Sequence, residues 1–206
     1  MGERQIGHSG YRPAIRLAWA QLKRGEPADR LAGTGARPGD GGAVVLRCFG
    51  DDYAIDAAEE SIRRENGEEP HIGLKILLLH YLNTASDLPA KNKEIGFAQI
   101  PGATGYLAPF NGRVVFPLVK MFDNFGEKTA AAFAKIGADA KDFATQCYVV
   151  QAFPRVPITV IFWSGDEEIA SGGQIVFDEG ITGYLCIEDV VITCEEMVRR
   201  LREILS

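Results

Sequence analysis

The sequence lacks the residue patterns that mark the common metal, redox and nucleotide sites. Its four cysteines, Cys48, Cys147, Cys186 and Cys194, are scattered, and no two of them form a C-x-x-C pair. Structural metal and iron–sulfur sites need ligands at short, set spacings. The G-x-S-x-G, H-E-x-x-H and phosphate-loop patterns are also missing. We therefore expect no metal cluster held by these cysteines and assign no metal ligand, although the sequence leaves metal binding itself open. The common hydrolase and nucleotide-binding classes have no direct support.

Long apolar runs and an excess of positive charge are missing as well. No apolar run approaches the roughly 18 residues that cross a bilayer, and the N-terminal segment lacks the apolar centre of a signal peptide. The formal charge of −6 argues against non-specific nucleic-acid binding, which requires clustered lysine and arginine. We expect a cytoplasmic protein that binds neither nucleic acid nor a membrane.

What the sequence does contain is ordinary for a globular protein. Apolar residues make up 46% and charged residues 24% of the 206 positions, which is enough to bury one core. Residues 1–10 show no hydrophobic periodicity and are predicted to form a flexible tail. Residues 11–206 are predicted to form a single domain, and the sequence leaves the oligomeric state open.

Hydrophobic periodicity predicts an α+β fold, with a mainly antiparallel sheet centred on residues 146–178 and helices packed on it. The predicted helices cover residues 11–24, 74–84, 106–136 and 193–205. The predicted strands cover residues 43–48, 53–55, 94–100, 146–153, 156–163 and 174–177. The first two strands are joined by a turn at 49–52. Residues 57–67 are polar and are predicted to carry a helical turn or two. Thr193 is predicted to begin the last helix through a capping box with Glu196.

Arg155 is the first candidate for a binding residue. Pro154 and Pro157 restrict the residues before them to extended backbone, so Arg155 is expected on a stiff segment between two strands. A guanidinium group held in this way is suited to bidentate recognition of a carboxylate or a phosphate. The alternative is a salt bridge to a nearby acidic residue.

Trp163 with Asp166, Glu167 and Glu168 is the second candidate, because an indole at a strand end stands beside an acidic turn. Such a group could bind a cation or a metal, or place a general base, or it could be a solvated turn. Arg155 and Trp163 stand at opposite ends of one predicted strand, roughly 25 Å apart at 3.3 Å per residue. The sequence leaves open whether they belong to one site.

His80 and Tyr81 are the third candidate. They are the polar members of a segment, residues 74–82, that is apolar almost all round and therefore predicts a buried helix. A histidine in such a helix either satisfies its hydrogen bonds within the core or serves as a ligand or a general base. If His80 meets Arg155 across the core, a polar pocket follows.

Five stretches carry a resemblance to a known family. The bacterial and archaeal family catalogued as domain of unknown function 3786 resembles this chain at LLLHYLNTAS (77–86), GFAQIPGATGY (96–106), FPRVPITVIFWSGDEEI (153–169), IVFDEGITGYL (175–185) and IED (187–189). The similarity is continuous from about Ile15 to the C-terminus. Some members carry an additional N-terminal iron–sulfur domain of the kind seen in the corrinoid and carbon-monoxide metabolism of anaerobes, and this chain lacks the extra cysteines. The resemblance implies an accessory role in an anaerobe, near cofactor-dependent enzymes, and it supplies no activity.

These observations predict an accessory protein that binds a small anionic or cofactor-like ligand. Its pocket would be lined by His80, Tyr81, Arg155 and Trp163, with Glu167 and Glu168 at the rim. One alternative is an enzyme in which His80 or Glu167 is the general base and Arg155 anchors the substrate. Another is a protein–protein interaction module that uses exposed aromatic side chains such as Tyr106 and Phe110. The sequence identifies neither the ligand nor a catalytic residue.

Overall fold

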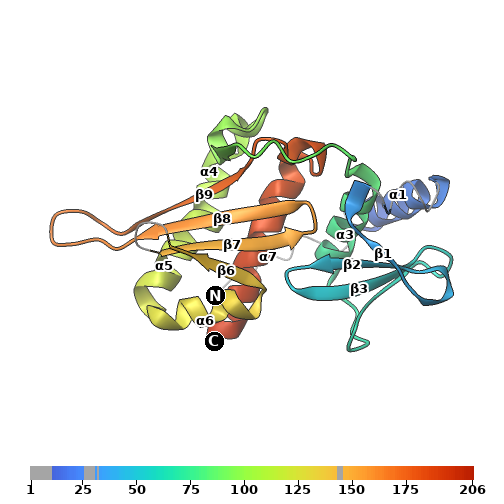
Figure 1. Ribbon diagram of the computed structural model, residues 1–206, viewed down its shortest axis with the longest axis horizontal. Coiled ribbons are helices and arrows are strands. Elements are labelled where there is room, and N and C mark those ends of the chain that lie inside the picture. Colours follow the sequence, from blue (N-terminus) through green and yellow to red (C-terminus); the bar gives the residue numbers. More distant parts are fainter. Residues whose placement is uncertain (1–10, 26–30, 32, 143–145) are drawn as a thin grey trace.

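The fold is α+β, as predicted, and it contains two antiparallel sheets (Figure 1). A computed structural model describes residues 11–25, 31, 33–142 and 146–206. The predicted flexible tail, residues 1–10, lies outside the described residues. In Figure 1 the smaller sheet lies beside the larger one, and α7 passes behind the larger sheet.

The two sheets contain short strands that pair only with antiparallel neighbours. In spatial order, the smaller sheet consists of β1 (Arg37–Pro38), β2 (Val44–Cys48), β3 (Asp51–Asp56) and β4 (Ser61–Arg64). In spatial order, the larger sheet consists of β5 (Glu94–Gly96), β9 (Gly172–Asp178), β8 (Val156–Trp163), β7 (Gln146–Phe153) and β6 (Ala138–Lys141). The bounds predicted for β7 and β8 are confirmed residue for residue.

Residues 57–67 were predicted to carry a helical turn or two. This prediction is wrong because Ser61–Arg64 form the strand β4. The strand alternates, with Ile62 buried and Arg63 exposed, but one apolar residue is too few to give a period-two signal. Pairing with β3 supplies the rest of its stability, since Ile62 lies opposite Ile55. The strand predicted at 94–100 is also shorter, because residues Phe97–Gln99 form a 3₁₀ turn.

The helices cover the segments that periodicity indicated. They are α1 (Tyr11–Arg24), α3 (Ile72–Thr84), α4 (Leu107–Phe110), α5 (Phe116–Phe125), α6 (Glu127–Lys135) and α7 (Ile187–Leu205). A π-helical turn at Asn111–Val115 connects α4 to α5. Helix α3 is buried along most of its length, as its apolar sequence predicted.

The predicted start of the last helix at Thr193 is wrong, because α7 begins six residues earlier at Ile187. Thr193 is buried inside the helix, and its hydroxyl donates to the carbonyl oxygen of Asp189 at 2.6 Å. A threonine in a helix interior can satisfy its hydroxyl on the carbonyl four residues earlier, so a capping-box pattern does not have to be a cap. Cys186 occupies the N-cap position instead.

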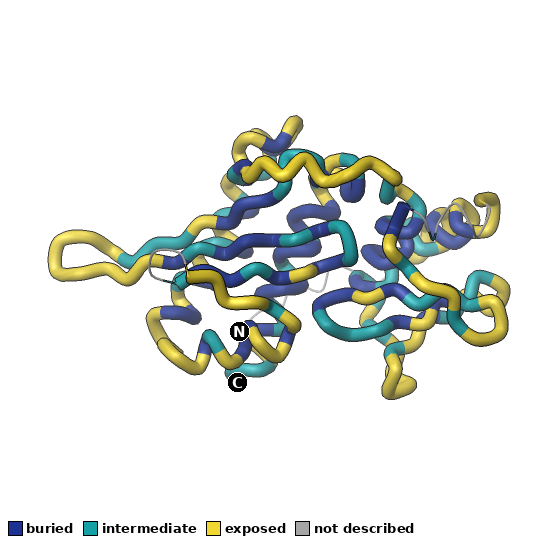
Figure 2. Tube along the Cα trace, viewed as in Figure 1, coloured by how far each residue is buried: buried dark blue, intermediate teal, exposed yellow. Residues whose placement is uncertain are grey.

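The core of the larger sheet is built from stacked aromatic rings between strands and helices. Phe122 of α5 stacks on Phe162 of β8, with ring centroids 4.2 Å apart. Phe133 of α6 stacks on Tyr148 of β7 at 4.5 Å. Figure 2 shows many buried positions along the central strands, and the stacking of Phe122 on Phe162 shows that a helix covers β8 on at least one side, as expected.

A two-residue turn, Phe49–Gly50, joins β2 to β3 and contacts the larger sheet. Both residues have positive φ, 49° and 82°, which is the backbone of a type I′ hairpin turn. Phe49 is buried, and its backbone N–H donates to Ala152 O of β7 at 3.1 Å. The predicted turn at 49–52 is therefore too long, because Asp51 and Asp52 already belong to β3.

Candidate functional site

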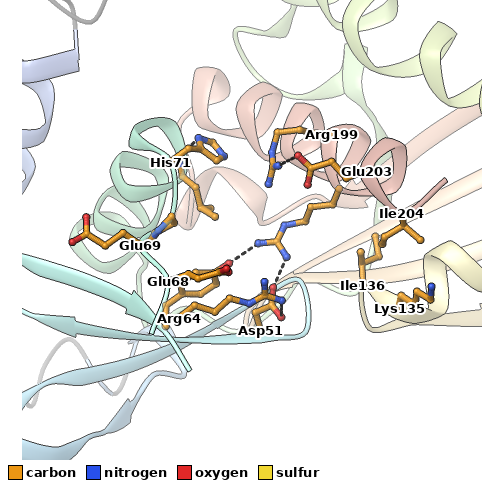
Figure 3. A pocket seen from close by; sticks show the side chains of 14 residues that line it. Asp51, Arg64, Glu68, Glu69, His71, Lys135, Ile136, Arg199, Glu203 and Ile204 are labelled. Atoms are coloured by element: carbon orange, nitrogen blue, oxygen red, sulfur yellow. Dashed lines mark hydrogen bonds and ion pairs between the residues drawn. The ribbon is translucent and has the colours of Figure 1, made fainter. Parts of the chain in front are cut away.

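A polar recess lies where the smaller sheet meets α6 and α7 (Figure 3). Its volume is about 470 Å³, within the range of small-molecule sites. Its charged side chains come from β3, β4, the β4–α3 connection, α6 and α7. They are Asp51, Arg64, Glu68, Glu69, Lys135, Arg199, Arg200 and Glu203. We call this cavity the charged recess.

Asp51 and Arg200 form the centre of the charged recess. Arg200 Nη1 donates to Asp51 Oδ2 at 2.6 Å, and its Nη2 donates to the Tyr53 hydroxyl at 2.6 Å. Its guanidinium also lies over the ring of Phe49, 5.3 Å from the centroid. The Arg200 side chain is only 10% exposed. Asp51 accepts a second hydrogen bond from Arg64, so one carboxylate joins β3, β4 and α7.

Glu196 precedes Arg199 and Arg200 by one helical turn on α7 and is 5% exposed. It accepts hydrogen bonds from Arg199 Nη2 at 2.7 Å and from Arg200 Nε at 2.8 Å. His71, the N-cap of α3, accepts from Leu74 N at Nδ1, so its Nε2 carries the proton that faces Glu196 Oε2 at 3.0 Å. Burial alone raises the pKa of Glu196, but the hydrogen bonds from Arg199 and His71 and the two arginine charges lower it to about 2.

Two charged side chains of the recess form no ion pair with any described residue. Lys135 is the last residue of α6 and is exposed. Glu68 follows β4, and its Oε2 accepts a hydrogen bond from Asn66 Nδ2 at 2.8 Å. Figure 3 shows Lys135 and Glu68 on opposite sides of the recess. The charged recess therefore presents one uncompensated cation and one uncompensated anion.

The residues predicted from the sequence lie elsewhere, and two of them meet. Tyr81 is fully buried and stacks on Phe153, with ring centroids 4.3 Å apart. Its hydroxyl donates to Thr34 O at 2.8 Å and accepts from the backbone N–H of Arg155 at 3.2 Å. Burial raises the pKa of Tyr81. Arg155 lies in the β7–β8 turn, and its Nη2 is 3.6 Å from the exposed carboxylate of Asp87, a contact that solvent screens.

His80 follows Tyr81 on α3 but points to the start of α7. Its Nδ1 lies 3.0 Å and 3.1 Å from the two carboxylate oxygens of Asp189, which is 4% exposed. The Cys186 thiol donates to Oδ2 of the same carboxylate at 3.1 Å. The bond to Asp189 raises the pKa of His80 against the opposing effect of burial, and burial raises the pKa of the Cys186 thiol.

Trp163, Glu167 and Glu168 lie on the β8–β9 hairpin, which extends beyond the rest of the larger sheet in Figure 1. Trp163 is 40% exposed and lies across the ladder from Gly172. Asp166 accepts the backbone N–H groups of Glu168 and Ile169 at 2.9 Å and 2.8 Å, which closes the turn. The role of Trp163, Glu167 and Glu168 as ligand-binding residues stays a prediction. Trp163 ends β8, and Arg155 directly precedes the other end of this strand.

One aromatic residue of the interaction-module alternative was misplaced. Phe110 was expected to be exposed, yet it is 2% exposed and stacks on Phe97 with ring centroids 3.8 Å apart. Pro109 is tolerated inside α4 because it stands in the first turn of that helix. Tyr106 is partly buried against the core.

The sequence reasoning missed every charged residue of the recess. The partners are distant in the chain: Arg200 and Asp51 are 149 positions apart, and His71 and Glu196 are 125 apart. One local signal was the acidic pair Asp51–Asp52 directly after a hairpin turn, which was predicted to be part of the turn at 49–52. The polar pattern of α7, in which Glu196, Arg199, Arg200 and Glu203 recur at helical spacing, was a second signal.

Two features of the described residues bear on cofactors and membranes. No group of three or more histidine, cysteine, aspartate or glutamate side chains among them is arranged to hold a metal ion. None of the described helices combines the length and the apolar composition that crossing a bilayer requires.

Comparison with known proteins gives one result. No curated protein and no solved structure matches the chain. A family match covers residues 26–200, which includes every strand and all but the end of α7. The chain therefore belongs to the family described as Domain of unknown function (DUF3786), as its sequence resemblance predicted.

Proposed function

We propose that the protein binds a small anionic ligand in the charged recess. The observation that carries the proposal is Lys135, whose ammonium group has no carboxylate partner among the described residues. Across the recess, Arg64 has one guanidinium nitrogen on Asp51, and the remaining donors of its fork have no acceptor in the described part of the chain. An anionic ligand in the recess would have a cation on either side: Lys135, which has no ion-pair partner among the described residues, and Arg64, whose charge Asp51 partly neutralises.

The surrounding residues support the proposal because they fix the site before a ligand arrives. Asp51 holds Arg64 and Arg200 together, and Glu196 holds Arg199 and Arg200 from below. A site whose cations are already ordered loses little side-chain entropy on binding. The same ion pairs connect the smaller sheet to α7, so ligand affinity and the packing of the two sheets depend on shared groups.

Isothermal titration calorimetry with acetate, succinate and inorganic phosphate tests this proposal. The wild-type protein is expected to bind at least one of these anions. Lys135→Gln is expected to weaken that binding at least about tenfold, because a hydrogen bond to a charged group contributes roughly 1.5–3 kcal/mol. Lys128→Gln is the matched control, since Lys128 is an exposed lysine on the same helix. Equal affinity in the wild type and Lys135→Gln would refute the site.

A second candidate function, acid–base catalysis at His80, is favoured by its bond to the buried carboxylate of Asp189. This arrangement fixes the orientation of the imidazole through Nδ1 and leaves Nε2 on a side chain that is 33% exposed. The proton of the neutral ring is then held on Nδ1. The required observation is a substrate whose bell-shaped pH–rate profile loses one limb in His80→Gln. A profile that the substitution leaves unchanged would retire this candidate.

The broader expectation from the family resemblance, a cofactor-like ligand and an accessory role beside enzymes of an anaerobe, remains a proposal. The charged recess suits a small polar ligand or a charged arm of a larger one. Arg155 and Tyr81, which do not line the charged recess, stay predicted binding residues.

A further inference from the structure

The internal pairing of charges in the recess indicates what a complementary ligand must carry. Most of its charged side chains are neutralised by a neighbour. These ion pairs are Asp51–Arg64, Asp51–Arg200, Arg199–Glu203 and Glu69–Lys75. When they are set aside, Lys135 and Glu68 remain as the recess residues without an ion-pair partner among the described residues. One cation and one anion are left for a ligand.

Glu68 is held in place although no cation neutralises it. The Asn66 side-chain amide donates to Glu68 Oε2 at 2.8 Å, and the backbone N–H of Glu68 donates to Asn66 Oδ1 at 3.0 Å. The backbone N–H of Arg64 donates to the Glu68 carbonyl at 2.8 Å, which closes the turn after β4. The amide orients the carboxylate but leaves its charge uncompensated. Oε1 of Glu68 therefore remains available as an acceptor.

Lys135 and Glu68 cannot serve one another, because they stand on opposite sides of the recess (Figure 3). A ligand with anionic groups only would be attracted by Lys135 and repelled by Glu68. The repulsion at Glu68 would lower the affinity for simple anions. A ligand with one anionic and one cationic end would satisfy both residues.

We propose that the ligand of the charged recess is a zwitterion with a separated carboxylate or phosphate and an ammonium group. Its anionic end lies against Lys135, and its ammonium end lies against Glu68 on the opposite side of the recess (Figure 3). This inference rests on the proposed anion site and names its substrate class as amino-acid-like molecules. Glu68 is the specificity residue, because it acts only on the cationic end.

Calorimetric titrations with matched probes test this inference. The zwitterions are γ-aminobutyrate and ε-aminocaproate, which differ only in the distance between their carboxylate and ammonium groups. Two distances are tested because the separation of Lys135 and Glu68 decides which ligand length fits. The anionic controls are butyrate and caproate, and the cationic controls are butylamine and hexylamine. At least one zwitterion is expected to bind about tenfold or more tightly than both of its single-charge analogues.

Variants then assign each end of the ligand. Glu68→Gln is expected to remove the advantage of the zwitterion over its carboxylate analogue and to leave the carboxylate affinity unchanged or slightly improved. Glu65→Gln is the matched control, an exposed glutamate three residues earlier that does not line the recess. Lys135→Gln is expected to weaken the carboxylate and the zwitterion alike. Circular dichroism of each variant confirms that the fold is retained.

The outcomes separate the two proposals. If carboxylates bind as tightly as zwitterions and Glu68→Gln changes nothing, the zwitterion inference is wrong and the anion site stands. If no carboxylate or zwitterion binds, or if Lys135→Gln has no effect on either, both proposals are wrong. A zwitterion preference that persists in Glu68→Gln would also overturn the assignment of Glu68.

Discussion

Asp51 and Asp52 are neighbours on β3, but they face opposite sides of the smaller sheet and stabilise the fold to different extents. Asp51 lies in the charged recess and pairs with Arg64 and Arg200. Asp52 faces a second hollow and pairs with Arg37 and Arg47. The two carboxylates are almost equally exposed, 19% and 18%.

The difference lies in their partners. The Arg200 side chain is 10% exposed, whereas those of Arg37 and Arg47 are 61% and 65% exposed. An exposed ion pair contributes little because solvent screens it and its side chains lose entropy. A buried arginine cannot lose its partners without leaving an uncompensated charge. The comparison teaches that the burial of the cation, rather than the number of ion pairs, decides how much each cluster contributes to the stability of the fold.

The largest effect is expected from Arg200→Met, which keeps most of the side-chain volume and removes the charge. Asp51 and Glu196 would each lose a partner in a buried setting, so the variant should be destabilised by about 3–5 kcal/mol. Urea unfolding followed by circular dichroism measures this change. A loss below about 1 kcal/mol would show that the recess cluster behaves like an exposed one.

The second-largest effect is expected on the free energy of unfolding at low pH, and it arises from Glu196. Its pKa in the folded protein is about 2, below its ordinary value of 4.5, so the stability it contributes is present above pH 4.5 and is lost as the pH falls toward 2. The contribution is roughly 3 kcal/mol, because each pKa unit corresponds to about 1.4 kcal/mol. Urea unfolding between pH 6 and pH 2 should show a steep loss in the wild type. Glu196→Gln should start lower and fall less, and parallel curves would contradict this assignment.

The smallest effect is expected from Arg47→Met, the counterpart of Arg200→Met on the other face of β3. Its ion pair with Asp52 is 3.9 Å long, and its side chain is mostly solvated. The free energy of unfolding should change by no more than about 0.5–1 kcal/mol, and any change should shrink in high salt. A change as large as that of Arg200→Met would break the comparison between the two clusters.

Much of the fold could be predicted because its signals are local. Helix α1 is marked by apolar residues at helical spacing, with Pro13 near its start and Gly25 after its end, and β7 and β8 by long β-prone runs. The candidate site could not be predicted in the same way. His80 was predicted as a polar residue of an apolar helix and Arg155 as a cation on a stiff, proline-flanked segment, but the structure gives them different partners, Asp189 and Asp87.

The sequence by itself determined the α+β class, the central strands, the buried helix α3 and membership of the DUF3786 family, because periodicity and local motifs report on neighbouring residues. The tertiary structure decided which carboxylate meets which arginine. That choice depends on how the Phe49–Gly50 turn brings β3 against α7, and no short-range pattern encodes a contact between Asp51 and Arg200 across 149 positions. The charged recess exists only because this packing places the two halves of the chain side by side.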